Sequence, residues 1–459
     1  MGADPAASKR DIRYCELKTG KRLLRTGVKC ASIAGGKIIY GGVCRIRRRF
    51  AVFHDIKAFC KWALIAVAVG IAAGLVGTAF HYGVEWVTEL RGTYPWLIFL
   101  LPAGGVCIAG IYKLCGAEKD GGTNYVLDTV REDKKVPLIT LPVIFISTII
   151  THLCGGSSGR EGAALQIGSS ISDNIGRLIH LDEKDMHIMT MCGMAAAFSA
   201  LFGTPVTAAV FSIEVVSIGI MHFSALVPCM ISALTGLMTA QLFHVAPTRF
   251  VITEMVVLTP VTLVRVVCLS VLCAFVSILF CLVMKQTAKL YQKFVPNPFL
   301  KAAAGGLIVI ALTLAVGSQY YNGAGMGNID AAFHSEVPWY VFLVKLLFTA
   351  CTLGAGFKGG EIVPAFFTGA AFGNAASRLA GLPASFGTGI GLVCLFCGVT
   401  NCPLTSVILS VELFGSEGLP FFAAACAASY MLSGYTGLYT EQKIMYSKTK
   451  AEYIDRKTM

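Results

Sequence analysis

Residues 155–168 read GGSSGREGAALQIG, a stretch that sets Arg160 and Glu161 side by side behind a run of glycines. The chain around it is very apolar, with 55% hydrophobic and only 14% charged residues. A soluble protein carries roughly 25% charged residues. Glycine-rich backbone at membrane depth is tolerated only where it faces protein or a water-filled cavity. The stretch therefore predicts a break between membrane helices, and charged residues at such a place are usually functional.

Long apolar runs predict several membrane-spanning helices, since a spanning helix needs about 20 mostly apolar residues. Runs of nearly this length or longer lie at 62–82, 96–112, 136–153, 266–284 and 340–355. We expect an all-α, multi-pass integral membrane protein. No apolar core of a secretory signal precedes about residue 50.

The two ends of the chain are basic. Residues 1–50 hold 13 Lys and Arg against 3 Asp and Glu, and a further basic group includes Lys443, Lys448 and Arg456. Because positive residues favour the cytoplasmic side, both termini are expected inside the cell. The net charge of +12 then reflects topology and contact with anionic lipid, and no nucleic-acid partner is expected.

The sequence repeats itself in two halves. The segment TPVTAAVFSIEV (204–215) resembles CPLTSVILSVEL (402–413), and GGSSGREGAAL resembles AGFKGGEIVPAF, with Glu161 and Glu361 aligned about 200 residues apart. Such repeats are often inverted, with the substrate site where broken helices meet. We predict a basic arm over 1–50, a first half over 51–244, a second half over 245–446 and a cytoplasmic tail over 447–459.

Each break precedes a helix whose start suits an anion. One helix is expected from 159–162 to about Leu178, and another after the glycine pair 359–360, with Pro364 in its first turn. The free N–H groups and partial positive charge of two helix N-termini bind an anion without a neighbouring full charge. Binding of that kind is weak enough for release.

The carboxylate of Glu161 is itself an anion, so it can occupy such a site as a tethered competitor that leaves when protonated. The alternative is a carboxylate that caps the helix or pairs with Arg160. We expect Arg160 to pair with a carboxylate or carbonyls elsewhere. Glu361 is the second acid at a break, whereas Glu214 and Glu412 are equally compatible with a structural and a functional role.

These motifs resemble the CLC family of anion channels and transporters. GREGAALQIG is similar to its G-[KR]-E-G-P signature, GGEIVPAFFTGAAFGN to its second-half signature, and GLYTEQKI to the segment that holds an anion-contacting tyrosine, here Tyr439. The resemblance covers roughly residues 55–446. It implies an inverted-repeat fold of tilted and discontinuous helices, a homodimer with one pore per subunit, and a gating glutamate at Glu161.

The departures from the family pattern point to one branch. The first signature, usually G-S-G-I-P, is replaced by DGGTNYVLDTV (120–130); Ala163 follows Gly162; and Val215 stands where chloride/proton exchangers carry an internal relay glutamate. With G-E-I-V-P at Glu361, the set resembles the fluoride-transporting branch, CLC-F. Val363 differs from the threonine in one form of that motif, which removes a hydroxyl ligand.

We therefore expect a fluoride/proton antiporter of the inner cell membrane. Glu161 would gate and carry the proton and Glu361 would be the second proton or fluoride group. The anion pathway would be formed by Asn124, Gly159, Arg160, Gly162, Ile362, Val363 and Tyr439. A protonated Glu361 could donate a short, strong hydrogen bond to fluoride, which is small and strongly hydrated.

Two rival functions remain. A chloride/proton exchanger or chloride channel would share the fold, and Val215 argues against the exchanger. An intramembrane enzyme would use Glu161 or His152, but neither a nucleophile motif nor metal-ligand spacing involving His187, His244 or His334 accompanies them. The 17 cysteines show no such spacing either, so we expect buried reduced thiols, no metal and no cofactor.

Overall fold

The computed structural model describes residues 41–118, 121–132 and 134–459. It divides into two compact units, Met1–Cys60 and Lys61–Met459. In the first unit, the described part is helical from Gly41 onward. Most of the predicted basic arm lies outside the described residues. The helix that begins at Gly41 continues to Thr93, so the predicted boundary between residues 50 and 51 falls inside a helix.

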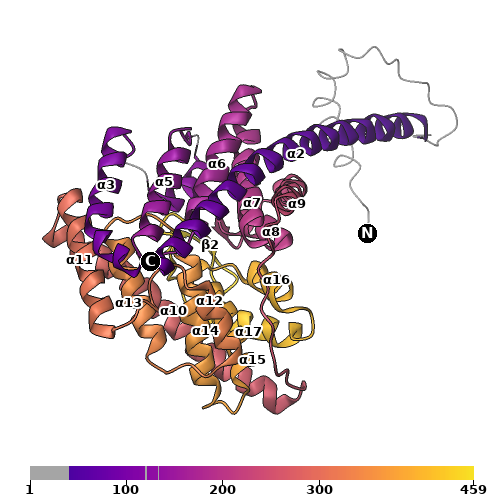
Figure 1. Cartoon of the computed structure of the whole chain (residues 1–459). Coiled ribbons are helices and arrows are strands. Elements are labelled where there is room, and N and C mark those ends of the chain that lie inside the picture. The colour runs from indigo at the N-terminus through magenta and orange to yellow at the C-terminus, as the bar shows by residue number, and fades with distance from the viewer. Residues whose placement is uncertain (1–40, 119–120, 133) are drawn as a thin grey trace. The chain divides into compact units, whose positions relative to one another are not determined.

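In the described part of the chain, the elements are helices with three short strands (Figure 1). Their bounds are α2 Gly41–Thr93, η1 Pro95–Leu100, α3 Leu101–Leu114, α4 Thr123–Thr129, α5 Thr140–Leu153, α6 Glu161–Leu178, α7 Glu183–Phe202, α8 Pro205–Glu214, β1 Ser217–Ile218, η2 Phe223–Ala225, α9 Leu226–Leu242, α10 Pro260–Phe294, α11 Pro298–Val316, α12 Met326–His334, α13 Val341–Gly354, α14 Ile362–Ser377, α15 Ala384–Thr400, α16 Pro403–Phe414, α17 Leu419–Leu432, β2 Lys443–Tyr446 and β3 Tyr453–Lys457.

Within the described residues, six helical segments are long and apolar enough to cross a membrane: Ile56–Thr93, Pro95–Leu114, Glu183–Phe202, Phe223–Leu242, Pro260–Phe294 and Pro298–Val316. The all-α, multi-pass prediction is confirmed. The third, fourth and sixth of these segments were missed.

Two predicted spans are shorter than expected. α5 and α13 have 14 residues each. α5 begins only after Pro137, where the missing N–H and the restricted backbone oppose an earlier helical start, whereas α13 is one residue shorter than its predicted span at each end.

The two halves build matching helix pairs. α6 packs on α7, and α14 packs on α15. At each crossing the backbones approach closely, because a Cβ on Gly168 would lie 2.1 Å from the carbonyl oxygen of Gly193, and one on Gly369 would lie 2.4 Å from that of Gly391. Small residues allow this approach where no hydrophobic effect drives helices together. α15 is buried on all sides, as expected of a helix that is apolar all round.

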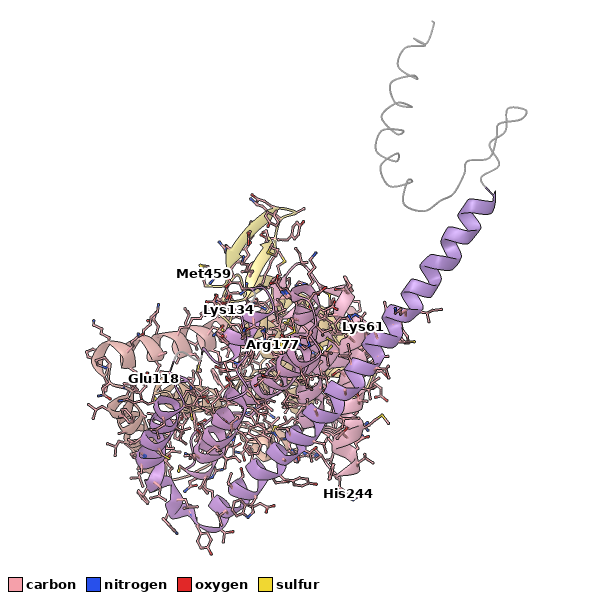
Figure 2. The ribbon with its side chains drawn as sticks, turned by 90° about the horizontal axis from the view of Figure 1, so that it is seen from above. Lys61, Glu118, Lys134, Arg177, His244 and Met459 are labelled. Carbon is pink, nitrogen blue, oxygen red and sulfur yellow. The ribbon has the colours of Figure 1, made fainter. Side chains whose placement is uncertain are left out.

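The C-terminal residues form a small sheet. β1 pairs parallel with β2, and β2 pairs antiparallel with β3. The segment predicted as a tail from residue 447 therefore contains a strand that returns onto Lys443–Tyr446. In Figure 2, Met459 lies beside this sheet at one edge of the second unit, and His244, just after α9, lies at the opposite edge.

Candidate anion and proton site

The two glycine-rich breaks pair directly with each other. Gly159 and Gly360 form an isolated antiparallel bridge, with the N–H of each donating to the carbonyl of the other at 2.7 and 2.8 Å. Side chains of the preceding helices join this contact: the Ser157 N–H donates to Thr352 Oγ1 at 3.1 Å, and the Lys358 N–H donates to Thr151 Oγ1 at 3.3 Å. Both breaks thus meet at one point, as the repeat predicted.

The carboxylate of Glu161 lies at this meeting point and is fully buried. One oxygen accepts from the Arg160 N–H at 3.0 Å, and the other accepts from the Val363 N–H at 3.3 Å. The carboxylate is held by N–H groups at the starts of both α6 and α14. Such groups bind small anions, so the carboxylate occupies a position that suits one.

Glycines on both strands of the bridge leave room for this carboxylate. A Cβ on Gly159 would lie 2.2 Å from Glu161 Oε2, and one on Gly360 would lie 2.6 Å from the same atom. Gly162 faces Thr123 Oγ1, which would lie 3.1 Å from an added Cβ. The start of α4 therefore packs against the break.

A cavity of about 210 Å³ lies beside Glu361. It is also lined by Asn124, Lys285 and Thr440. Asn124 is fixed by its Oδ1, which accepts from the Glu441 N–H at 3.2 Å. The structure thus brings together two predicted residues, Glu361 and Asn124, at one water-accessible position.

A larger cavity, about 510 Å³, reaches Arg160. Its lining includes His81, Glu85, Arg91 and His152. The Arg160 guanidinium contacts His81 Nδ1 at 2.8 Å. Among the described residues the hydrogen-bond partner of this guanidinium is thus an imidazole nitrogen, whereas a carboxylate or carbonyls were expected.

Tyr439 carries a buried hydroxyl with no hydrogen-bond partner among the described residues. It lies within electrostatic range of Glu361 and Glu161. A buried hydroxyl without a partner is costly, so a ligand or water is expected to satisfy it. The predicted residues Ile362 and Val363 are buried at the start of α14.

Glu214 and Glu412 each cap the start of a helix in the other half of the repeat. Glu214 accepts from the N–H groups of Leu404 and Thr405 at 3.1 and 2.8 Å, at the start of α16. In the reciprocal contact, Glu412 accepts from Val206 and Thr207 at 3.0 and 2.8 Å, at the start of α8. The structural alternative therefore fits both residues.

A buried valine, Val215, stands at the position where chloride/proton exchangers carry a relay glutamate. Val215 is fully buried, and its carbonyl accepts from Gln442 Nε2 at 2.9 Å. The same amide donates to the Thr400 carbonyl at 2.8 Å. A proton path through this position would therefore meet no titratable side chain at Val215.

Sequence reasoning missed His81, although the residue lies within the first predicted span. An ionisable side chain inside a span is a usable signal. Its partner could not be read from the sequence, because Arg160 lies in a different segment.

Known proteins share the motifs and the fold of this chain. The family model described as voltage gated chloride channel matches residues 104–434. The chain belongs to this family, the CLC family. A chloride/fluoride channel protein of Pseudomonas syringae pv. tomato is 36% identical over 395 residues, which cover 84% of this chain and 87% of that protein.

Solved CLC structures share the fold. The crystal structure of a CLC-type fluoride/proton antiporter has a TM-score of 0.81 and 30% identity, covering 84% of this chain and 98% of the other. A slow cyanobacterial Cl⁻/H⁺ antiporter has a TM-score of 0.69 at 18% identity, covering 81% of this chain and 94% of the other. The second likeness concerns the fold alone. The chain is a CLC-family membrane transport protein, as the motifs predicted.

Proposed function

We propose that this chain is a fluoride/proton antiporter that exports fluoride across the inner membrane of a cell, as a homodimer with both termini in the cytoplasm. The observation that carries the proposal is the buried carboxylate of Glu161, held by N–H groups of two helix starts. Protonation would weaken both hydrogen bonds and release the side chain. A fluoride ion would then take the place of the carboxylate at the same N–H groups.

The two cavities supply the two sides of the exchange. The one lined by Glu361 and Asn124 would open to the cytoplasm. The one lined by Arg160 and His81 would open to the outside, on the side where α2 ends. Glu161 lies at the break between them, so its movement would connect the anion site with one cavity at a time.

The preference for fluoride rests on residues at the inner cavity. A strongly hydrated anion needs strong donors to replace its water. A protonated Glu361 is such a donor, and hydrogen bonds from O–H groups to anions are short and strong. Asn124, which lines the same cavity, and the buried Tyr439 hydroxyl, which has no hydrogen-bond partner among the described residues, would complete the set. The similarity to a fluoride/proton antiporter over most of the chain favours the same anion.

Anion efflux from liposomes tests this proposal. Purified full-length protein is reconstituted, fluoride or chloride is loaded in parallel, and external pH is recorded with each anion. Fast fluoride efflux with a matching rise in external pH, and slow chloride efflux, is the expected result. Equal chloride efflux would assign the chain to chloride transport on the same fold. Fluoride efflux without proton movement would make it a fluoride channel.

A further inference from the structure

The guanidinium of Arg160 is held by an uncharged imidazole. Its Nη1 lies 2.8 Å from His81 Nδ1. Arginine has donors and no acceptor, so Nδ1 must accept through its lone pair. The ring proton of neutral His81 is then on Nε2. This fixes both the charge state and the tautomer of His81 while the contact exists.

The other ring nitrogen faces a carboxylate. His81 Nε2 lies 3.4 Å from Glu85 Oε2, one helical turn further along α2. The Glu85 side chain is 51% exposed and that of His81 is 14% exposed. Both residues line the cavity of about 510 Å³, so a proton from solution can reach the ring.

The neighbourhood of the ring contains charges of both signs. Arg160 comes from the break before α6 and Glu85 from α2 itself, and the Tyr82 ring stands edge-on at 5.4 Å. Glu89, Arg91 and His152 line the same cavity. Arg160 forms no direct ion pair among the described residues, although the Glu161 and Glu85 carboxylates lie near enough to attract it.

We propose that His81 is a positioning residue that sets the place of the Arg160 side chain, and that a proton on His81 Nδ1 releases Arg160 and thereby makes the gate respond to pH. The proposal deepens the proposed function, because it rests on Glu161 as the gate. A protonated Nδ1 cannot accept a hydrogen bond, and the imidazolium repels the guanidinium. The ring then pairs with Glu85 instead.

Arg160, which carries the freed guanidinium, directly precedes the gating residue Glu161 in the chain. The guanidinium becomes available to attract the transported anion to the N–H groups that a protonated, neutral Glu161 has left. Acid in this cavity would therefore act twice: by protonating Glu161 and by freeing Arg160. The rate of anion exchange should rise more steeply with acidity than a single titration allows.

Two variants separate the parts of this proposal. In His81→Asn, Oδ1 can accept from Arg160 near the position of Nδ1 but cannot take up a proton. In His81→Ala, the acceptor is lost altogether. His334→Asn is the matched control, because His334 is exposed on α12, bonds to the carbonyl of Asp330 at 3.1 Å and is not among the residues that line the cavity.

The measurement is the initial rate of anion efflux from liposomes, with equal pH on both sides so that protein orientation does not matter. The range is about pH 4.0 to 7.5, because a ring that accepts from a guanidinium takes up a proton only at more acid pH than a free imidazole, whose pKa is about 6.5. The wild type and His334→Asn should show the same steep acid response. His81→Ala should be faster than the wild type near neutral pH, because Arg160 is released without a proton. His81→Asn should keep the wild-type rate near neutral pH, because Oδ1 still holds Arg160, and its acid response should be shallower than that of the wild type.

Two outcomes would overturn the proposal. One is a wild-type acid response in His81→Asn, which would mean that the ring does not titrate in the cycle. The other is an equal loss in both His81 variants with unchanged pH profiles, which would leave only a packing role. The rates are measured with whichever anion the wild type carries, so a failure of fluoride selectivity leaves this test intact.

Discussion

The carboxylate of Glu161 accepts a 3.3 Å hydrogen bond from the backbone N–H of Val363, which follows it by 202 residues in the chain. The contact joins the start of α14 to the start of α6. It places the carboxylate of one half on the donor groups of the other half. A change at either break is therefore expected to affect transport more than stability.

Replacing Glu161 by Gln should uncouple the two ions. Glutamine keeps the shape of the side chain but cannot take up a proton, so fluoride efflux should continue without a rise in external pH. Parallel recordings of fluoride and pH on the same liposomes give the number of protons moved per fluoride ion. Glu417→Gln, at an exposed position, is the control, and proton uptake that persists in Glu161→Gln would remove Glu161 from the proton route.

Glu361→Gln should reduce anion selectivity. The variant replaces the short O–H donor of a protonated carboxyl with the weaker N–H of an amide, so it loses part of the roughly 1.5–3 kcal/mol that a hydrogen bond to a charged group contributes. The ratio of fluoride to chloride efflux should therefore fall several-fold, up to about tenfold. The control is Glu336→Gln, whose side chain is 70% exposed in a surface ion pair with Arg378. An unchanged ratio would place selectivity elsewhere.

Gly360→Ala should stop transport by filling the place of the carboxylate. The new Cβ would lie 2.6 Å from Glu161 Oε2 and 2.7 Å from the Gly162 nitrogen, and backbone atoms cannot move aside cheaply. Efflux is expected to fall at least about tenfold, since a misplaced reacting group commonly has such an effect. Gly92→Ala, where nothing lies within 4 Å, should retain the wild-type rate.

Tyr439→Phe should weaken anion binding without weakening the fold. Its hydroxyl has no hydrogen-bond partner among the described residues, so removing it breaks no bond within the protein. The apparent KM for fluoride should rise about tenfold if the hydroxyl contacts the ion, while the melting temperature stays the same. Tyr340→Phe, at an exposed site, serves for comparison. A lower melting temperature with unchanged KM would make Tyr439 a structural residue.

Glu214→Ala and Glu412→Ala should lower stability and leave the proton-to-anion ratio unchanged. Each removes the acceptor of two helix-start N–H groups, and unsatisfied buried donors cost about 1–3 kcal/mol. Thermal unfolding in detergent measures the loss. Thr405→Val should have a smaller effect, since it removes only the hydroxyl contact with Glu214. An altered ion ratio in Glu214→Ala would instead make that residue a functional acid.

The sequence predicted those parts of the site that depend on local signals. Glycine-rich breaks and Pro364 correctly placed the starts of α6 and α14, because glycine permits a break in the backbone and proline favours the first turn of a helix. Hydropathy alone overestimated α5, since it does not record the effect of Pro137.

Contacts between distant segments could not be predicted. Arg160 and His81 are 79 residues apart, and the caps formed by Glu214 and Glu412 join residues about 200 positions apart. Nothing in a local pattern specifies such a partner. The sequence showed that these charges are unusual in an apolar chain, and only the folded arrangement showed what each one contacts.

The exchange of caps between α8 and α16 has a consequence for biosynthesis. Glu214 leaves the ribosome long before Leu404 and Thr405 have been made, and a carboxylate without partners is unfavourable in a bilayer. During that interval the first half is an incomplete intermediate, because the N–H groups that donate to Glu214 have not yet been synthesised. A truncated chain that ends before α16 would keep this defect permanently, which would make it a ready target for cellular quality control.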